Sequence, residues 1–174
     1  MFDPFNDRLS RDVRNSLSEA FVASLMQMEE GGYLEQSQEW LRQGLTRTYR
    51  QYIQDRIQRY DLAFQQIQKK QIDDARIQAL ILWNHGLFFE VHDILESIWH
   101  KTKGNEHRAI KGLIKAAGVY VHREYNRTSS AQRLAAKSAN LLNTYAGILG
   151  FISNLNVLIE ALNTSNPLPP VLEF

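Results

Sequence analysis

The stretch LFFEVHDILESIWHKTKGNEHRAIKGLIKAAGVYVH, residues 87–122, decides the fold because it predicts two helices joined by a turn. Its first half carries apolar residues at the three- and four-residue spacing of one helix face. These residues are Phe88, Val91, Leu95 and Ile98. Gly104 and Asn105 then interrupt the pattern, as a turn does. We therefore expect a helical hairpin formed by residues 87–102 and 106–126.

The rest of the chain predicts further helices. No proline occurs between Pro4 and Pro167, and Leu, Ala, Gln, Arg and Glu are abundant there. The expected helices cover about residues 10–30, 35–53, 55–82, 87–102, 106–126, 129–144 and 148–163. We predict an all-α fold, a compact bundle of about six to seven helices with the hairpin at its centre. Its expected parts are an N-terminal helical extension (1–72), a helical domain (73–165) and an extended C-terminal tail (166–174).

An amphipathic stripe marks the N-terminal extension. Apolar side chains recur at spacings of four and three residues, at Ile53, Ile57, Tyr60, Phe64 and Ile67. An exposed stripe of this size would usually be an interface. We expect the extension to pack on the helical domain or on a second subunit, so a homo-oligomer formed through the N-terminal helices is a possible assembly.

Composition excludes several classes of protein. Apolar residues make up 44% of the 174 residues and charged residues 22%, as in soluble globular proteins. The absence of cysteine excludes disulfides, thiolate metal sites and cysteine nucleophiles. The N-terminus is acidic and broken by Pro4, unlike a secretory signal, and no apolar run is long enough to cross a bilayer. The sequence predicts a soluble, cytoplasmic protein with no membrane partner.

Charge is balanced over the whole chain but not locally. The net charge is +1, yet residues 101–137 hold nine Lys and Arg against Glu106 and Glu124. A basic helix face attracts phosphates, but no zinc finger, glycine-rich phosphate loop or RNA-binding aromatic motif accompanies it. We expect a solvated face paired with the acidic segment 81–100, and no nucleic-acid partner.

The residues richest in chemistry lie in the predicted hairpin. His92, Glu96 and Trp99 occur at i, i+4 and i+7, so they share one side of a helix. Burying either charged group without a partner costs several kcal/mol, about 2–7 for a polar group. We expect a buried polar clasp in which Glu96 meets a cationic or N–H donor. The candidate donors are Lys111 and Lys115 of the facing helix, His92 and the Trp99 indole. Small residues of the facing helix, including Gly112 and Ala116, would leave room for the tryptophan.

These segments resemble the DUF309 family, helical bacterial and archaeal proteins of unknown function with an HxxxExxW motif. The resemblance is carried by residues 86–99, by Gly112-Leu113-Ile114 and by His122, and it covers about residues 74–145. It implies a compact helical fold and no particular activity.

Two functional hypotheses remain open at this point, and the sequence leaves open whether the protein is an enzyme. The first is a helical binding module of unknown ligand, with no cofactor. Its candidate binding or clasp residues are Glu90, His92, Glu96, Trp99, Lys111, Lys115 and His122. The alternative is a metal-binding or hydrolase-like enzyme that uses His92, Glu96 and His122. HExxH is absent from the sequence, which disfavours the familiar helical zinc motif.

Overall fold

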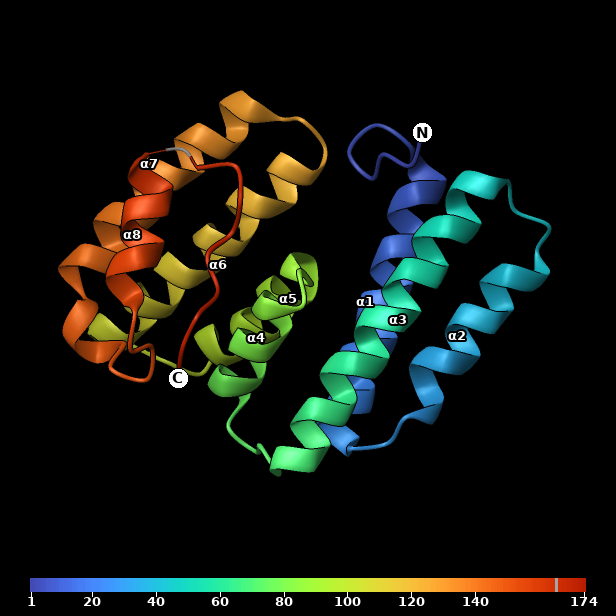
Figure 1. The fold of residues 1–174 in the computed structure, drawn as a ribbon, viewed down its shortest axis with the longest axis horizontal. Helices are drawn as coiled ribbons and strands as arrows, with labels where there is room; N and C mark the ends of the chain where they lie inside the picture. Colours follow the sequence, from blue (N-terminus) through green and yellow to red (C-terminus); the bar gives the residue numbers. More distant parts are fainter. Residues whose placement is uncertain (165) are drawn as a thin grey trace. The chain divides into compact units, whose positions relative to one another are not determined.

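A computed structural model describes residues 1–164 and 166–174, and these residues form helices without any strand. Helix accounts for 74% of the chain, which confirms the predicted all-α class. Eight α-helices and one short 3₁₀ helix occur in the described residues, slightly more than predicted (Figure 1). They are α1 (Arg8–Gln27), α2 (Gly31–Arg42), α3 (Arg47–Lys70), α4 (Ala75–Asn84), α5 (Phe88–Trp99), α6 (Gly104–Glu124), α7 (Thr128–Thr144), η1 (Ala146–Ile148) and α8 (Leu155–Asn163).

Contacts divide the chain into two compact units, Met1–Gln71 and Ile72–Phe174, which we call unit 1 and unit 2. The single helix predicted over 55–82 was wrong, because the chain leaves the helical conformation at the division. Gln71 adopts a left-handed conformation with φ of 52° and ends α3. Asp74 then caps α4 by accepting a hydrogen bond from the backbone N–H of Arg76 at 2.9 Å.

The predicted helix over 35–53 was also wrong. It is interrupted after Arg42, and α3 begins at Arg47. Gly44 between them has a φ of 68°, a backbone conformation that favours glycine.

Unit 1 covers the amphipathic stripe of α3 with its own helices. The ring of Tyr60 stacks on Phe21 of α1 with centroids 4.0 Å apart, and it meets Tyr33 of α2 edge-on at 5.7 Å. Ile53, Tyr60, Phe64 and Ile67 are fully buried, while Ile57 is half-buried. Because α1 and α2 lie over the stripe, it does not require a second subunit. Packing of unit 1 on the helical domain, and a homo-oligomer through its helices, stay predictions.

The first helix of unit 1 begins at a hydrogen-bonded carboxylate. Asp7 accepts bonds from the Ser10 backbone N–H at 2.9 Å, the Ser10 hydroxyl at 2.5 Å and the Tyr49 hydroxyl at 2.6 Å. These bonds, the Ser10 hydroxyl first and Tyr49 next, hold the pKa of Asp7 at about 2. The cap therefore ties α1 to α3.

Unit 2 is built around α6, which contacts both α5 and α7 (Figure 1). The predicted hairpin of α5 and α6 is formed, and Gly104 at its turn has a φ of 62°. The small-residue side of α6 differs from the prediction at its glycines. A Cβ on Gly112 would lie 2.9 Å from Leu142 of α7, and one on Gly118 would lie 3.4 Å from Leu134. These glycines bring α7 close rather than making room for Trp99.

The tail after α8 is extended and lies beside α4. The Trp83 indole donates to the Pro170 carbonyl at 2.8 Å. The Asn84 amide donates to the Leu172 carbonyl and accepts from its N–H, both at 2.8 Å. Leu172 is 2% exposed, whereas Val171 is 70% exposed. Hydrogen bonds to its backbone and the buried side chain of Leu172 thus hold the tail, and we call residues 170–172 the strap.

Candidate anion-binding groove

The expected clasp is present only along its own helix and is not buried. His92 Nδ1 lies 3.4 Å from an Asp93 carboxylate oxygen and 4.0 Å from a Glu96 carboxylate oxygen. The side chains of His92 and Glu96 are 35% and 46% exposed. Among the described residues Glu96 makes no ion pair with Lys111 or Lys115, and of the expected donors only His92 lies beside it, on the same helix. A half-exposed carboxylate stays hydrated and does not need a cationic partner within the protein.

Trp99 anchors the beginning of α6. Its ring stacks on His107 with centroids 4.3 Å apart, and His107 Nδ1 lies 3.1 Å from the Trp99 carbonyl oxygen. The Lys111 ammonium is 5.7 Å from the centre of the indole. The indole nitrogen itself is buried and has no hydrogen-bond partner in the part of the chain that the structure describes. Trp99 therefore fixes where α6 starts and where Lys111 lies.

The other clasp candidates do not form one site with His92 and Glu96. Glu90 is fully buried. His122 lines a hollow with residues of α7, and burial lowers its pKa, followed in effect by the charges of Arg127 and Arg133. Over residues 1–164 and 166–174 no group of three or more His, Asp or Glu side chains is placed to hold a metal ion. The residues suggested for a metal site are thus not gathered into one.

Basic side chains instead gather between α6 and α7, in two hollows of about 480 and 250 Å³ that share Lys137. We call the two hollows together the cationic groove. The larger is lined by Arg108, Lys111, Lys115, Lys137, Asn140, Leu141 and Tyr145. The smaller is lined by His122, Ser130, Arg133, Leu134 and Lys137. Asn140 and Ser130 add neutral hydrogen-bonding groups to these cations.

The sequence builds this groove by helical spacing. Basic residues at 108, 111 and 115 follow one side of α6, and those at 133 and 137 follow one side of α7. The two helices run antiparallel, because the Arg108 guanidinium donates to the Tyr145 hydroxyl at 3.0 Å while His122 lies with Ser130. Gly112 lets α7 approach, and its carbonyl accepts a hydrogen bond from Ser138 at 2.7 Å. The close approach brings the two basic rows together.

The positive charges of the cationic groove are not neutralised by neighbouring carboxylates among the described residues. No Asp or Glu is among its lining residues. Within the described ranges, Arg108, Lys111, Lys115, Arg133 and Lys137 make no ion pair. Burial lowers the pKa of Lys115, and repulsion from Lys111 and Lys137 lowers it further.

For the five groove cations, the expected pairing with the acidic segment 81–100 is therefore not found. Asp93 and Glu96 lie beside His92 on α5 instead.

Sequence reasoning named Lys111, Lys115 and His122 but missed the remaining polar lining residues. These are Arg108, Ser130, Arg133, Lys137, Asn140 and Tyr145. The signal was available as the spacing of basic residues on two consecutive helices. It was read as a solvated face because nothing in the sequence shows which sides of the two helices meet.

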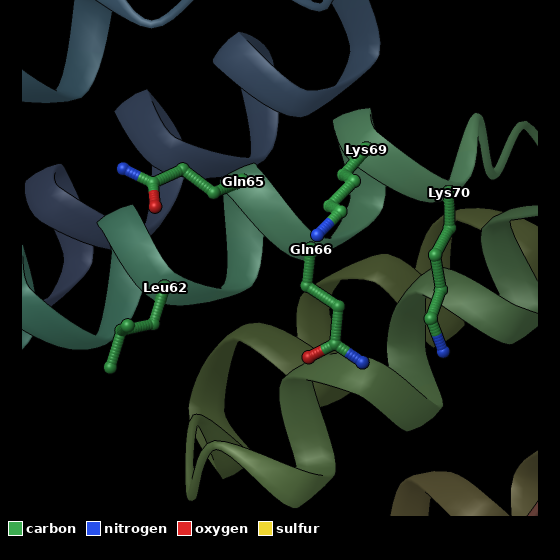
Figure 2. A pocket seen from close by; sticks show the side chains of 5 residues that line it. All are labelled: Leu62, Gln65, Gln66, Lys69 and Lys70. Atoms are coloured by element: carbon green, nitrogen blue, oxygen red, sulfur yellow. The ribbon is translucent and has the colours of Figure 1, made fainter.

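A further hollow, of about 460 Å³, lies along the end of α3 in unit 1 (Figure 2). Its lining side chains are Leu62, Gln65, Gln66, Lys69 and Lys70. Figure 2 shows them following one helix, with two lysines near its end. The feature offers fewer cations than the cationic groove and supplies a matched control for it.

Comparison with known families gives one partial match and no activity. Residues 77–134, about a third of the chain, match the model of DUF309, a domain of unknown function. The match confirms the resemblance expected from the HxxxExxW motif and spans α4 to the first turns of α7. No curated protein and no solved structure matches the chain. In the described residues, no helix combines the length and the apolar character needed to cross a membrane.

Proposed function

We propose that unit 2 is a helical binding module whose cationic groove holds an anionic, phosphate-bearing ligand. One observation carries the proposal: five Lys and Arg side chains line the α6–α7 groove without a carboxylate among them. Like charges held together raise the free energy of the unliganded protein, and a bound anion relieves this repulsion. We further propose that the protein acts in the cytoplasm.

The chemistry of the lining residues supports binding. Arg108 and Arg133 present planar guanidinium groups, which suit two phosphate oxygens at once, and the lysines act as point charges. Arg108 is oriented by its hydrogen bond to Tyr145. The alternative of a metal-dependent or hydrolase-like enzyme would require His92, Glu96 and His122 to converge on one reacting atom. The first two pair along α5, and the third lines the cationic groove.

Titration of the full-length protein with inorganic tripolyphosphate tests the proposal. Backbone amide NMR signals should shift saturably along α6 and α7. Replacing the shared lysine, Lys137→Glu, should weaken binding at least about tenfold, which corresponds to about 1.4 kcal/mol. Lys69→Glu is the matched control, because it reverses one exposed charge in the hollow of α3 (Figure 2). Equal loss in both variants, or no saturable shift, would contradict the proposal.

A pH series gives a second readout. The pKa of His122 is lowered by burial and by nearby arginines, so the ring is neutral near pH 7. A bound anion favours the protonated ring and raises that pKa. Binding should therefore tighten as the pH falls through the histidine range, and His122→Gln should flatten this dependence.

A further inference from the structure

We propose that the cationic groove binds a single-stranded polynucleotide, with phosphates along its basic rows and one base on the ring of Tyr145. This inference rests on the proposed function and adds the class of ligand. It departs from the expectation that no nucleic acid binds. That expectation assumed acidic partners for the basic residues of 101–137, and the structure does not provide them for the five groove cations.

The length of the groove favours an extended ligand over a small anion. Lining residues run from Arg108 to His122 on α6, which at a rise of about 1.5 Å per residue spans about 21 Å. The charges of a stacked strand recur about every 3.4 Å along its axis, and those of a stretched strand lie farther apart. The groove is therefore long enough for about five phosphates, whereas a single small anion would fill one hollow only.

The charges match this length. Five Lys and Arg side chains are distributed along the groove rather than gathered at one point. Arg108, Lys111 and Lys115 lie on one wall, Arg133 and Lys137 lie on the other, and Lys137 belongs to both hollows. Their ammonium and guanidinium groups make no ion pair with any described residue, so phosphates would not have to displace a carboxylate. A row of this kind follows a strand's backbone in the manner of other single-strand binding channels.

The aromatic ring of Tyr145 could stack on a base, a contact that inorganic polyphosphate cannot make. Its half-buried ring lines the larger hollow, and its hydroxyl accepts the hydrogen bond from Arg108. Asn140 lies one helical turn earlier and offers both a donor and an acceptor. An aromatic ring beside phosphate-binding cations is where an unpaired base can stack. A duplex keeps its bases stacked inside and would leave this ring unused, so the arrangement favours a single strand.

Fluorescence anisotropy with labelled oligothymidylates tests the length and charge of the site. Affinity for the full-length protein should rise with length up to about five nucleotides and then level off. The slope of log affinity against log salt should be about −3.5, since each single-strand phosphate contact contributes about −0.7. Lys137→Glu removes one such contact and should make the slope shallower by about 0.7, and Lys69→Glu should leave it unchanged.

A pair of variants at Tyr145 tests base recognition separately from phosphate binding. Tyr145→Leu removes the ring and should weaken oligothymidylate binding about tenfold more than it weakens tripolyphosphate binding. Tyr145→Phe keeps the ring and should keep the ratio of the two affinities within about twofold of the original. Thermal melting of both variants shows that the helices remain folded.

The outcomes separate this inference from the proposed function. If tripolyphosphate binds and oligothymidylates of every length bind no more tightly, the polynucleotide inference is overturned and the anion-binding module stands. If a duplex or polyglutamate of similar charge binds as tightly as the single strand, the inference is also overturned. If no anion binds, both proposals fail together.

Discussion

Replacing Gly112 by alanine tests the close approach of α6 and α7 on which the cationic groove depends. The added Cβ would lie 2.9 Å from Leu142 Cδ2 and 3.2 Å from Leu141 Cβ. Leu142 is fully buried, so its side chain cannot swing into solvent to make room. The carbonyl of Gly112 is also held by the Ser138 hydroxyl, which resists a shift of α6 against α7.

Two opposing effects set the magnitude. Alanine is favoured over glycine within a helix by about 1 kcal/mol. Forcing a methyl group into a closely packed contact costs about 1–3 kcal/mol. Because the buried Leu142 side chain has no room to move away, the packing cost should exceed the helix preference for alanine. Gly112→Ala should therefore destabilise unit 2 by about 1 kcal/mol.

Gly118→Ala is the matched control on the same helix. Its Cβ would lie 3.4 Å from Leu134, an ordinary contact, so the helix preference should dominate. This variant should be more stable than the original by up to about 1 kcal/mol. The two variants differ in packing and share the same change of residue.

Urea unfolding followed by circular dichroism measures both free energies of unfolding. The expected order is Gly118→Ala, the original protein, then Gly112→Ala. If Gly112→Ala proves as stable as Gly118→Ala, the helices are not in close contact at that position and the reasoning fails. Tripolyphosphate binding should weaken in Gly112→Ala, because the two basic rows would be pushed apart.

Three further predictions concern single side chains. Glu96→Gln should change the free energy of unfolding by no more than about 0.5 kcal/mol, because Glu96 is half-exposed and lies 4.0 Å from His92 Nδ1. A loss several times larger in urea unfolding would support the buried clasp. Asn84→Ala removes both hydrogen bonds to Leu172 and should cost about 1–3 kcal/mol; faster amide hydrogen exchange at Leu172 measures it, and unchanged exchange would count against the strap. The depressed pKa of Asp7, about 2, contributes stability that is present above the unfolded value of 3.8 and is lost as the pH falls toward 2, so Asp7→Asn should reduce the acid sensitivity of unfolding; an unaltered pH profile would refute this.

Local sequence signals predicted much of the helical architecture. The spacing of apolar residues predicted α5, and the apolar stripe of α3 predicted which of its sides is buried. Gly104 was correctly placed at the turn of the hairpin, where φ is positive. These features depend on residues within a few turns of each other, so a sequence pattern suffices to find them.

Features that depend on how helices meet were not predictable in the same way. Gln71 ends α3 in a left-handed conformation, although glutamine is not a residue type that usually ends a helix in this way. The apolar spacing continues into the next segment, so the sequence predicted one helix where two occur. Tertiary packing, and not local preference, decides such a boundary.

The candidate site was missed for a similar reason. Lys111 and Lys115 were named among the candidate donors to Glu96, because a carboxylate buried in the hairpin would need a partner. The exposure of Glu96 removes that requirement. Gly112 was read as space for Trp99, while its open side faces Leu142. Which of two neighbouring helices fills a glycine's space depends on the rotation of α6, which the sequence pattern does not specify.

The strap formed by the tail also has a consequence for the order of folding. The bond from Trp83 to Pro170 and those between Asn84 and Leu172 join residues 87 and 88 positions apart. Contacts across so long a loop form late, because the chain entropy of closure must first be offset by nearer contacts. During synthesis, Trp83 and Asn84 are made well before their partners. Trp83 and Asn84 can therefore form these hydrogen bonds only after residues 170–172 have been synthesised.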